Sequence, residues 1–173
     1  MTNKRIPVLS FVGRSKTGKT ALIEKLIPLL DSKGIKVAVI KHHHRDFEID
    51  ITGKDTHRLK HAGAHTVIIS SPGKIAIIQD TWKEPSIEDI VSKYASNVDI
   101  VITEGYKKAD MPKIEVYQKK ENLPPVCIDD KNLLALVSDL PIVASAPVFL
   151  RDDIEGIIEL ILSQFALRVA GQV

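Results

Sequence analysis

The segment GRSKTGKT, residues 13–20, constrains the fold of this chain more than any other part of its sequence. It follows the apolar run IPVLSFV and precedes four leucines, at positions 22, 26, 29 and 30, that would share one face of a helix. The segment matches the pattern G-x-x-x-x-G-K-[ST] at every fixed position, with a predicted strand before it and a predicted helix after it. It therefore predicts a phosphate-binding loop that joins the first strand to the first helix.

Each residue type in this loop suits the binding of a polyphosphate. Glycine at position 13 lets the chain turn off the strand, and glycine at position 18 lets the backbone approach a phosphate closely. The backbone N–H groups and the helix N-terminus attract the anion. Lys19 would contact the β- and γ-phosphates, while the Thr20 hydroxyl would bind Mg²⁺. The expected nucleotide-binding residues are Gly13, Arg14, Ser15, Lys16, Thr17, Gly18, Lys19, Thr20 and Ala21. A glycine-containing surface turn with lysines is the alternative.

Apolar runs of strand length alternate with helical patterns along the rest of the chain. We predict further strands at 35–42, 65–70, 74–79, 98–103, 113–118, 132–138 and 146–150, and further helices at 54–64, 85–96 and 151–168. The strands show little polar alternation, which favours a mostly parallel sheet with helices on both faces. The turn signal Ser71-Pro72-Gly73 predicts an antiparallel hairpin within it. We expect a three-layer, P-loop NTPase-like α/β fold, with residues 1–173 forming a single nucleotide-binding domain.

The composition excludes several classes of protein. The 173-residue chain has one cysteine, Cys127, so it cannot form an intrachain disulfide, and this fits a reducing compartment. The formal net charge of +2 is too small to indicate a nucleic-acid binder. No apolar stretch approaches the ~20 residues that span a bilayer. We expect a cytoplasmic protein that binds neither nucleic acid nor a membrane.

Acidic residues that follow predicted strands are candidates for a metal site beside the loop. Glu104 lies at the carboxyl end of the strand VDIVIT, where open α/β sheets place their ligands, whereas Asp99 lies at the other end. We expect Glu104 to bind Mg²⁺ or orient its water shell together with Thr20. An ordinary exposed glutamate is the alternative. Asp46 and Asp50, after the second strand, would contact the Mg²⁺ through water.

Two groups of histidines follow the second predicted strand. His42, His43 and His44 are consecutive, and His57 and His61 would share one face of a helix. A transition-metal site built from these residues is possible, although the sequence contains no HExxH pattern. We favour a polar switch segment beside the nucleotide.

Three segments carry a family resemblance when they are taken together: GRSKTGKT, VAVIKHHHRDFEIDITGKDTHRLKHAGA and VDIVITEGYKKADMPKIEVYQ. They resemble the MobB family, molybdopterin-guanine dinucleotide biosynthesis protein B. The resemblance implies a P-loop protein that binds GTP with Mg²⁺, is typically a homodimer, and hydrolyses GTP weakly. It implies an adapter role beside the guanylyltransferase that joins GMP to Mo-molybdopterin. Its motifs fall on Gly13, Lys16, Gly18, Lys19, Thr20 and Glu104, and on His42, Asp46, Asp50 and Asp55. The His-His-Arg run after His42 departs from the family's histidine motif.

The residues predict slow hydrolysis and leave the base preference open. Lys19, with Arg14 or Lys16, would place positive charge near the γ-phosphate or across a dimer interface. No water-orienting glutamine or arginine finger is evident, so we expect weak turnover. Asp139, which follows a predicted strand, would accept hydrogen bonds from guanine N1 and N2, with a turn cap beside Pro141 as the alternative. The preference for GTP over ATP comes mainly from the resemblance.

Two other functions remain open at this stage. One is a small-molecule or nucleotide kinase, which the few and scattered arginines disfavour. The other is a metallochaperone GTPase that carries a metal ion on the run from His42 to His44.

Overall fold

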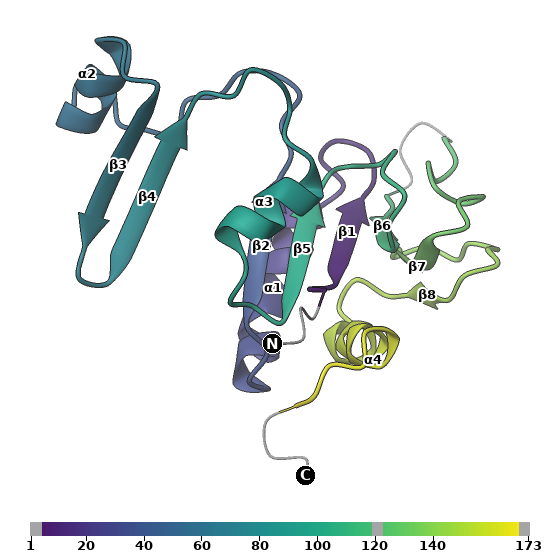
Figure 1. The fold of residues 1–173 in the computed structure, drawn as a ribbon. Helices are drawn as coiled ribbons and strands as arrows, with labels where there is room; N and C mark the ends of the chain where they lie inside the picture. Colours follow the sequence, from purple (N-terminus) through teal and green to yellow (C-terminus); the bar gives the residue numbers. More distant parts are fainter. Residues whose placement is uncertain (1–4, 119–122, 170–173) are drawn as a thin grey trace. The chain divides into compact units, whose positions relative to one another are not determined.

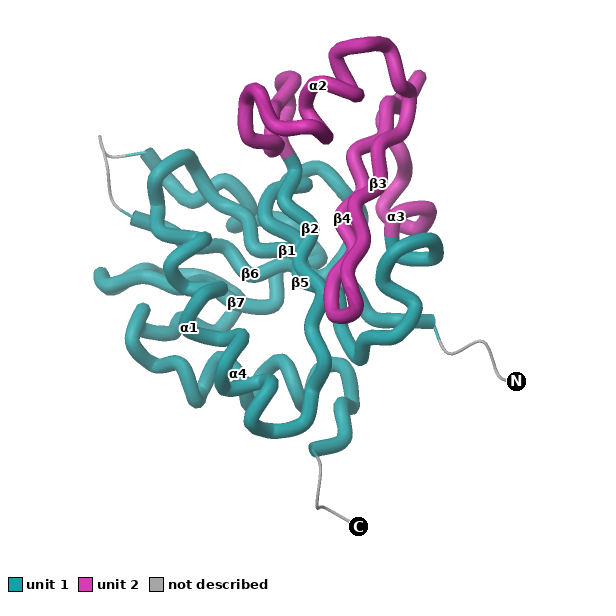
Figure 2. The backbone as a smooth tube through the Cα atoms, turned by 90° about the vertical axis from the view of Figure 1, so that its left-hand side faces the viewer, with its two compact units in different colours: residues 1–42, 91–173 teal, residues 43–90 magenta. Residues whose placement is uncertain are grey.

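In the computed structural model of the protein, residues 5–118 and 123–169 are described, and the chain divides into two compact units. Unit 1 comprises residues 1–42 and 91–173, and unit 2 comprises residues 43–90. Figure 2 distinguishes them by colour. Each unit contains its own sheet. The single nucleotide-binding domain over residues 1–173 stays a prediction.

Unit 1 is built on a six-stranded sheet in the order β2-β5-β1-β6-β7-β8 (Figure 1). Every pair of neighbours in it is parallel. The strands are β1 (Val8–Val12), β2 (Val37–Lys41), β5 (Ile100–Glu104), β6 (Lys113–Val116), β7 (Leu133–Val137) and β8 (Val148–Phe149). Strands β1, β5 and β6 are almost fully buried, as expected of central strands covered on both faces. The predicted mostly parallel α/β sheet is confirmed.

Helices α1 (Lys19–Ser32) and α4 (Ile154–Gln164) bury their apolar faces against the core of unit 1. Leu22, Leu26 and Leu30 of α1 are buried together with Ile157 and Ile161 of α4. Helix α1 continues to Ser32 despite a proline in its interior. The C-terminal half of α3 (Ile87–Tyr94), which belongs to unit 1, lies on the opposite side of β2 and β5 from α1 (Figures 1 and 2).

Helix α4 begins after an aspartate N-cap, Asp153. The Asp153 side chain accepts a hydrogen bond from the backbone N–H of Gly156, at 3.1 Å. This bond satisfies one of the free N–H groups of the first helical turn. The Asp153 side chain therefore sets the start of α4 at Ile154.

Unit 2 contains the hairpin of β3 (Thr66–Ser71) and β4 (Lys74–Gln79), and the short helix α2 (Asp55–His61). The hairpin predicted at Ser71-Pro72-Gly73 is confirmed, but it forms a separate two-stranded sheet and does not join the parallel one. Its side chains are mostly exposed, in contrast to the buried strands of unit 1. The turn residues fix the hairpin locally, whereas they carry no information about which sheet it joins. Among the described residues, no helix has the length and apolar character needed to cross a bilayer.

Candidate nucleotide-binding site

The loop between β1 and α1 has the backbone conformation of a tight turn into a helix N-terminus. Gly13 has φ +135° and Gly18 has φ +87°, both in a region that favours glycine. A Cβ at Gly13 would lie 2.3 Å from the carbonyl oxygen of Val116 at the end of β6. Lys16, a non-glycine residue, also has a positive φ of 61°. Residues held in such strained conformations cluster at ligand sites.

The Lys19 side chain folds back over this loop. Its Nζ donates to the carbonyl oxygen of Arg14 at 2.7 Å and lies 3.4 Å from that of Gly13. The Thr17 hydroxyl donates to the same Arg14 carbonyl at 3.0 Å. Burial lowers the pKa of Lys19, because desolvation disfavours its charged form, while the nearby Glu104 carboxylate opposes this shift. The loop therefore holds a partly desolvated ammonium group at the start of α1.

Thr20 and Glu104 meet at the same edge of the sheet. The Thr20 hydroxyl donates to a Glu104 carboxylate oxygen at 2.9 Å. Glu104 is the last residue of β5 and pairs in register with Phe11 of β1, so both strands end beside the loop. The Lys41 Nζ, from the end of β2, lies 3.5 Å from the same carboxylate oxygen. The structure thus brings together the two residues that the sequence assigned to Mg²⁺.

The two oxygens fit the chemistry of magnesium. Mg²⁺ prefers oxygen ligands and usually binds one or two protein groups together with several waters and substrate phosphates. A hydroxyl and a carboxylate oxygen lie 2.9 Å apart here, beside the N-terminus of α1. Lys41 supplies the positive charge that balances Glu104 in the structure described here. Their role as metal ligands stays a prediction.

Arg151, which sequence reasoning missed, braces the phosphate-binding loop. Its Nη1 donates to the carbonyl oxygen of Thr17 at 2.7 Å, and its Nη2 donates to that of Tyr117 at 3.3 Å. Its Nε donates to the Asp139 carboxylate at 2.9 Å. A Cβ at Gly18 would lie 2.6 Å from Nη1, so the glycine makes room for this arginine as well as for a ligand. Arg151 follows β8 at the carboxyl edge of the sheet. This position is the feature of the sequence that could have indicated its place beside the loop.

The other predicted residues lie in different surroundings. Asp139 is exposed and bound to Arg151, which connects it to the loop. The Arg14 Nη2 donates to the Pro124 carbonyl at 3.3 Å, and its Nε is buried with no hydrogen-bond partner among the described residues. Ser15, Lys16 and Ala21 are exposed.

Asp46 and Asp50 belong to unit 2, where Asp50 accepts a hydrogen bond from the Ile51 N–H at 2.8 Å. Their water-mediated role at the metal stays a prediction.

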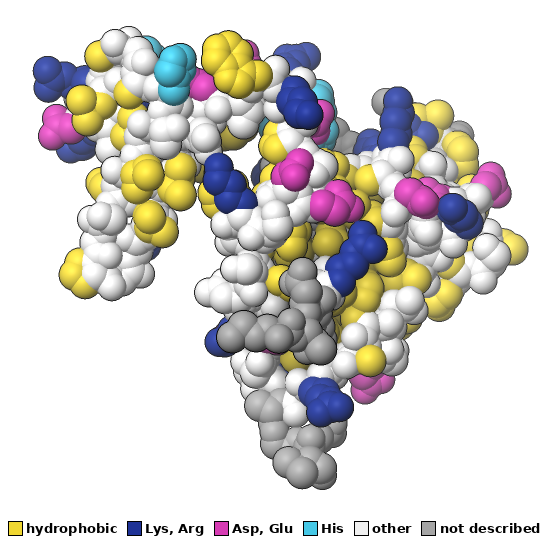
Figure 3. Space-filling view, viewed as in Figure 1, with side chains coloured by type: hydrophobic (Ala, Val, Ile, Leu, Met, Phe, Trp, Pro, Cys, Tyr) yellow, Lys and Arg dark blue, Asp and Glu magenta, His cyan; other side chains and the backbone are white. Residues whose placement is uncertain are grey.

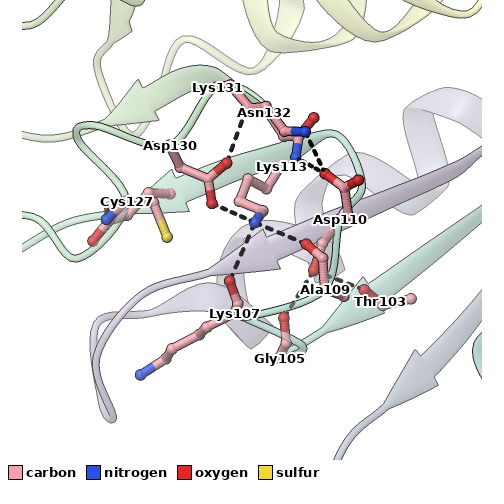
Figure 4. Close-up of polar contacts among 12 residues, drawn as sticks. Thr103, Gly105, Lys107, Ala109, Asp110, Lys113, Cys127, Asp130, Lys131 and Asn132 are labelled. Atoms are coloured by element: carbon pink, nitrogen blue, oxygen red, sulfur yellow. Dashed lines mark hydrogen bonds and ion pairs between the residues drawn. The ribbon is translucent and has the colours of Figure 1, made fainter.

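The loop that follows Glu104 is held by a buried lysine, as Figure 4 shows. Lys113 is 1% exposed, and its Nζ donates to the Asp130 carboxylate at 2.6 Å and to the carbonyls of Lys107 and Ala109 at 3.2 and 3.0 Å. These bonds fix the backbone between β5 and β6. The Ser10 hydroxyl donates to the Gly105 carbonyl at 2.8 Å, which fixes the residue directly after Glu104.

The comparisons with known proteins agree with this architecture. Residues 8–139 match the family model described as molybdopterin guanine dinucleotide synthesis protein B. The chain belongs to this family. A relative from Escherichia coli (strain K12), a molybdopterin-guanine dinucleotide biosynthesis adapter protein, is 32% identical over 161 residues, 91% of this chain and 92% of the relative. The corresponding adapter protein of Haemophilus influenzae is 37% identical and covers 81% of this chain and 79% of its own.

Solved structures of MobB proteins share the fold. A crystal structure of molybdopterin-guanine biosynthesis protein B matches with a TM-score of 0.76 at 36% identity, covering 92% of this chain and 99% of that one. The crystal structure of Bacillus subtilis MobB matches with a TM-score of 0.74 at 24% identity, covering 96% of this chain and all of that one. The predicted P-loop NTPase-like fold and the MobB resemblance are therefore confirmed.

Proposed function

We propose that this protein binds GTP with Mg²⁺ at the β1–α1 loop and acts as an adapter in the attachment of GMP to molybdopterin. Its relatives are named adapter proteins of molybdopterin-guanine dinucleotide biosynthesis, and the match covers most of both chains. The adapter role follows from family membership. The nucleotide and the metal follow from the residues of the loop.

The contact between Thr20 and Glu104 is the observation that carries the nucleotide proposal. A loop with two glycines at positive φ leads into the N-terminus of α1, where backbone N–H groups attract phosphate. The hydroxyl and carboxylate lie 2.9 Å apart at the same end of the helix. Mg²⁺ bound there would neutralise phosphate charge. A phosphate would also compete for the Lys19 ammonium with the carbonyl oxygens of Gly13 and Arg14, which lie 3.4 and 2.7 Å from its Nζ.

The protein's own residues support binding better than rapid hydrolysis. Lys19 would neutralise phosphate charge, and Arg14 or Lys16 would add positive charge near the γ-phosphate. Phosphoryl transfer also needs a positioned water and transition-state charge, and a partner's arginine typically raises turnover by roughly 10³- to 10⁵-fold. We propose weak intrinsic GTPase activity. Asp139 would recognise guanine only if its carboxylate, now bound by Arg151, turns toward the base.

The proposed partners follow from the family role. They are the molybdenum cofactor guanylyltransferase, molybdopterin itself and a second copy of this chain in a homodimer. The single cysteine, Cys127, is buried and free, which suits a reducing compartment, so we place the protein in the cytoplasm.

A magnesium-dependence experiment tests the site. GTP affinity would be measured by titration calorimetry with Mg²⁺ and with EDTA, in the wild type and in Glu104→Gln. Because the amide keeps the shape but lacks the charge, we expect the variant to lose most of the Mg²⁺-dependent gain and to keep its metal-free affinity. Equal gains from Mg²⁺ in both proteins would show that Glu104 is not part of the metal site.

A further inference from the structure

Unit 2 contains a group of potential metal ligands that includes no residue of the phosphate-binding loop. Glu48 lies in the segment before α2, and His57 and His61 lie one turn apart on that helix. One ligand atom from each of the three residues lies within 4.8 Å of the other two. The Nε2 of His61 is 3.6 Å from a carboxylate oxygen of Glu48. Among the described residues, this is the one group of three or more such side chains.

The hydrogen bond of the His61 ring orients it for ligation. Its Nδ1 lies 3.0 Å from the carbonyl oxygen of His57. Because a carbonyl only accepts, Nδ1 must carry the proton, and the lone pair of the neutral ring is then on Nε2, the atom nearest Glu48. Metal-binding histidines commonly donate their second ring N–H to a backbone carbonyl in this way, which fixes the tautomer and the ring orientation.

The His57 ring stacks on the His61 ring on the same face of α2. The two ring centroids are 4.0 Å apart with an interplanar angle of 23°. His57 is half-buried, whereas Glu48 and His61 are exposed, so an ion has access from solvent. Imidazole nitrogens bind metal in the plane of the ring, so the two stacked rings would turn apart to reach a common ion, since Zn²⁺ bonds to nitrogen and oxygen are about 2.0–2.2 Å long. The Gly53 N–H, now 3.4 Å from the His57 Nδ1, would lose this contact if that nitrogen bound the ion.

From this geometry we propose that Glu48, His57 and His61 form a binding site for a divalent transition-metal ion, of the class that Zn²⁺ represents. Two imidazoles and one carboxylate suit zinc and its neighbours better than Mg²⁺, which prefers oxygen ligands. Three protein ligands leave a fourth position for water. The bound ion would join the segment before α2 to the helix and stabilise unit 2, because no metal site of this kind exists in the unfolded chain.

His43 and His44 of the histidine run give a matched comparison within unit 2. The rings of His43 and His44 are stacked with centroids 5.7 Å apart, and the His43 Nδ1 is 2.9 Å from the Arg45 carbonyl. No carboxylate joins these two rings in a metal-binding group in the described part of the chain. The run therefore serves as the control for nonspecific binding to histidine.

The test is a Zn²⁺ titration of the full-length, untagged protein without nucleotide, by competition with a chromophoric chelator. The variants are His57→Gln, His61→Gln and Glu48→Gln, and the control is the double variant His43→Gln/His44→Gln. Circular dichroism checks that each variant is folded. Co²⁺ binding, followed by its visible absorption, reports the ligand environment in the wild type without relying on any substitution.

We expect one zinc ion per chain, an affinity at least about 10-fold lower in each histidine variant, and an unchanged affinity in the control. We also expect Co²⁺ to give the intense visible bands of a site with four or five ligands. The proposal is overturned if the control loses the binding and the His57 and His61 variants keep it, or if the wild type gives only the weak spectrum of hydrated Co²⁺.

Discussion

Arg151 and Gly13 show how single residues shape the phosphate-binding loop. Arg151 donates hydrogen bonds to two backbone carbonyls and to the Asp139 carboxylate, so it ties the loop to the ends of β6 and β7. Gly13 lets the carbonyl of Val116 approach to a distance that any Cβ would prevent. Both residues act on the loop's backbone, whose N–H groups are the expected phosphate ligands.

Replacing Arg151 should weaken nucleotide binding without removing any phosphate ligand. In Arg151→Met we expect GTP affinity to fall about 10-fold and the free energy of unfolding to fall by about 2 kcal/mol, because several charge-assisted hydrogen bonds are lost. Calorimetric titration and urea denaturation measure the two effects. The control is Arg168→Met, at an exposed arginine beyond α4. The bracing role would be refuted by equal GTP affinities in the two variants.

Replacing Gly13 should be more costly. Gly13→Ala places a Cβ 2.3 Å from the Val116 carbonyl oxygen at a φ of +135°. We therefore expect the free energy of unfolding to fall by about 3 kcal/mol and GTP binding to be lost. Gly73→Ala is the matched control, because a Cβ there meets nothing within 4 Å. Its stability should stay within about 0.5 kcal/mol of the wild type. Similar denaturation midpoints for both alanine variants would contradict this account of the loop.

At the scale of elements, the β5–β6 connection is held by buried charge and not by regular structure. Lys113, at the start of β6, binds two carbonyls of this connection and the carboxylate of Asp130 (Figure 4). The hydrogen bond from Lys113 is the largest influence on Asp130 and lowers its pKa. A carboxyl group whose pKa is lowered by folding stabilises the protein above its unfolded pKa, and this contribution is lost as the pH falls through the folded value.

Lys113→Met should therefore change both the stability and its dependence on pH. We expect a loss of about 3 kcal/mol at neutral pH, because the ion pair between the buried Lys113 and the partly exposed Asp130 is broken. The further loss below pH 3.8, the ordinary value for this carboxyl group, should be smaller in the variant than in the wild type. Urea denaturation at several pH values measures both. Lys131→Met removes an exposed ion pair with Asp110 and should cost under about 1 kcal/mol.

At the scale of the whole molecule, one contiguous motif predicted more than any longer pattern did. The loop pattern and the strand that ends at Glu104 predicted correctly that Thr20 and Glu104 would come together, because parallel strands end at one edge of a sheet. The separate sheet of β3 and β4 was not predictable in this way, because a turn signal specifies a hairpin but not its neighbours.

The side chains that support the site were harder to predict than those that form it. Arg151 contacts the Thr17 carbonyl, 134 residues away in the chain, and Lys113 contacts the Asp130 carboxylate, 17 residues away. Such contacts leave no local pattern in the sequence. Figure 3 shows charged side chains among apolar ones on the surface of unit 1. The amino-acid sequence does not distinguish such an exposed lysine from a buried one such as Lys113. Only packing makes that distinction.

The most direct test of the central claim is nucleotide selectivity in the presence of Mg²⁺. Titration calorimetry would compare GTP with ATP in the wild type and in Lys19→Ala. This substitution removes the ammonium group that lies over the loop. We predict that GTP binds at least about 10-fold more tightly than ATP, a difference of about 1.4 kcal/mol, and that Lys19→Ala loses this binding. Equal binding of ATP, with transfer of its phosphate to a small acceptor, would contradict the account and indicate a kinase.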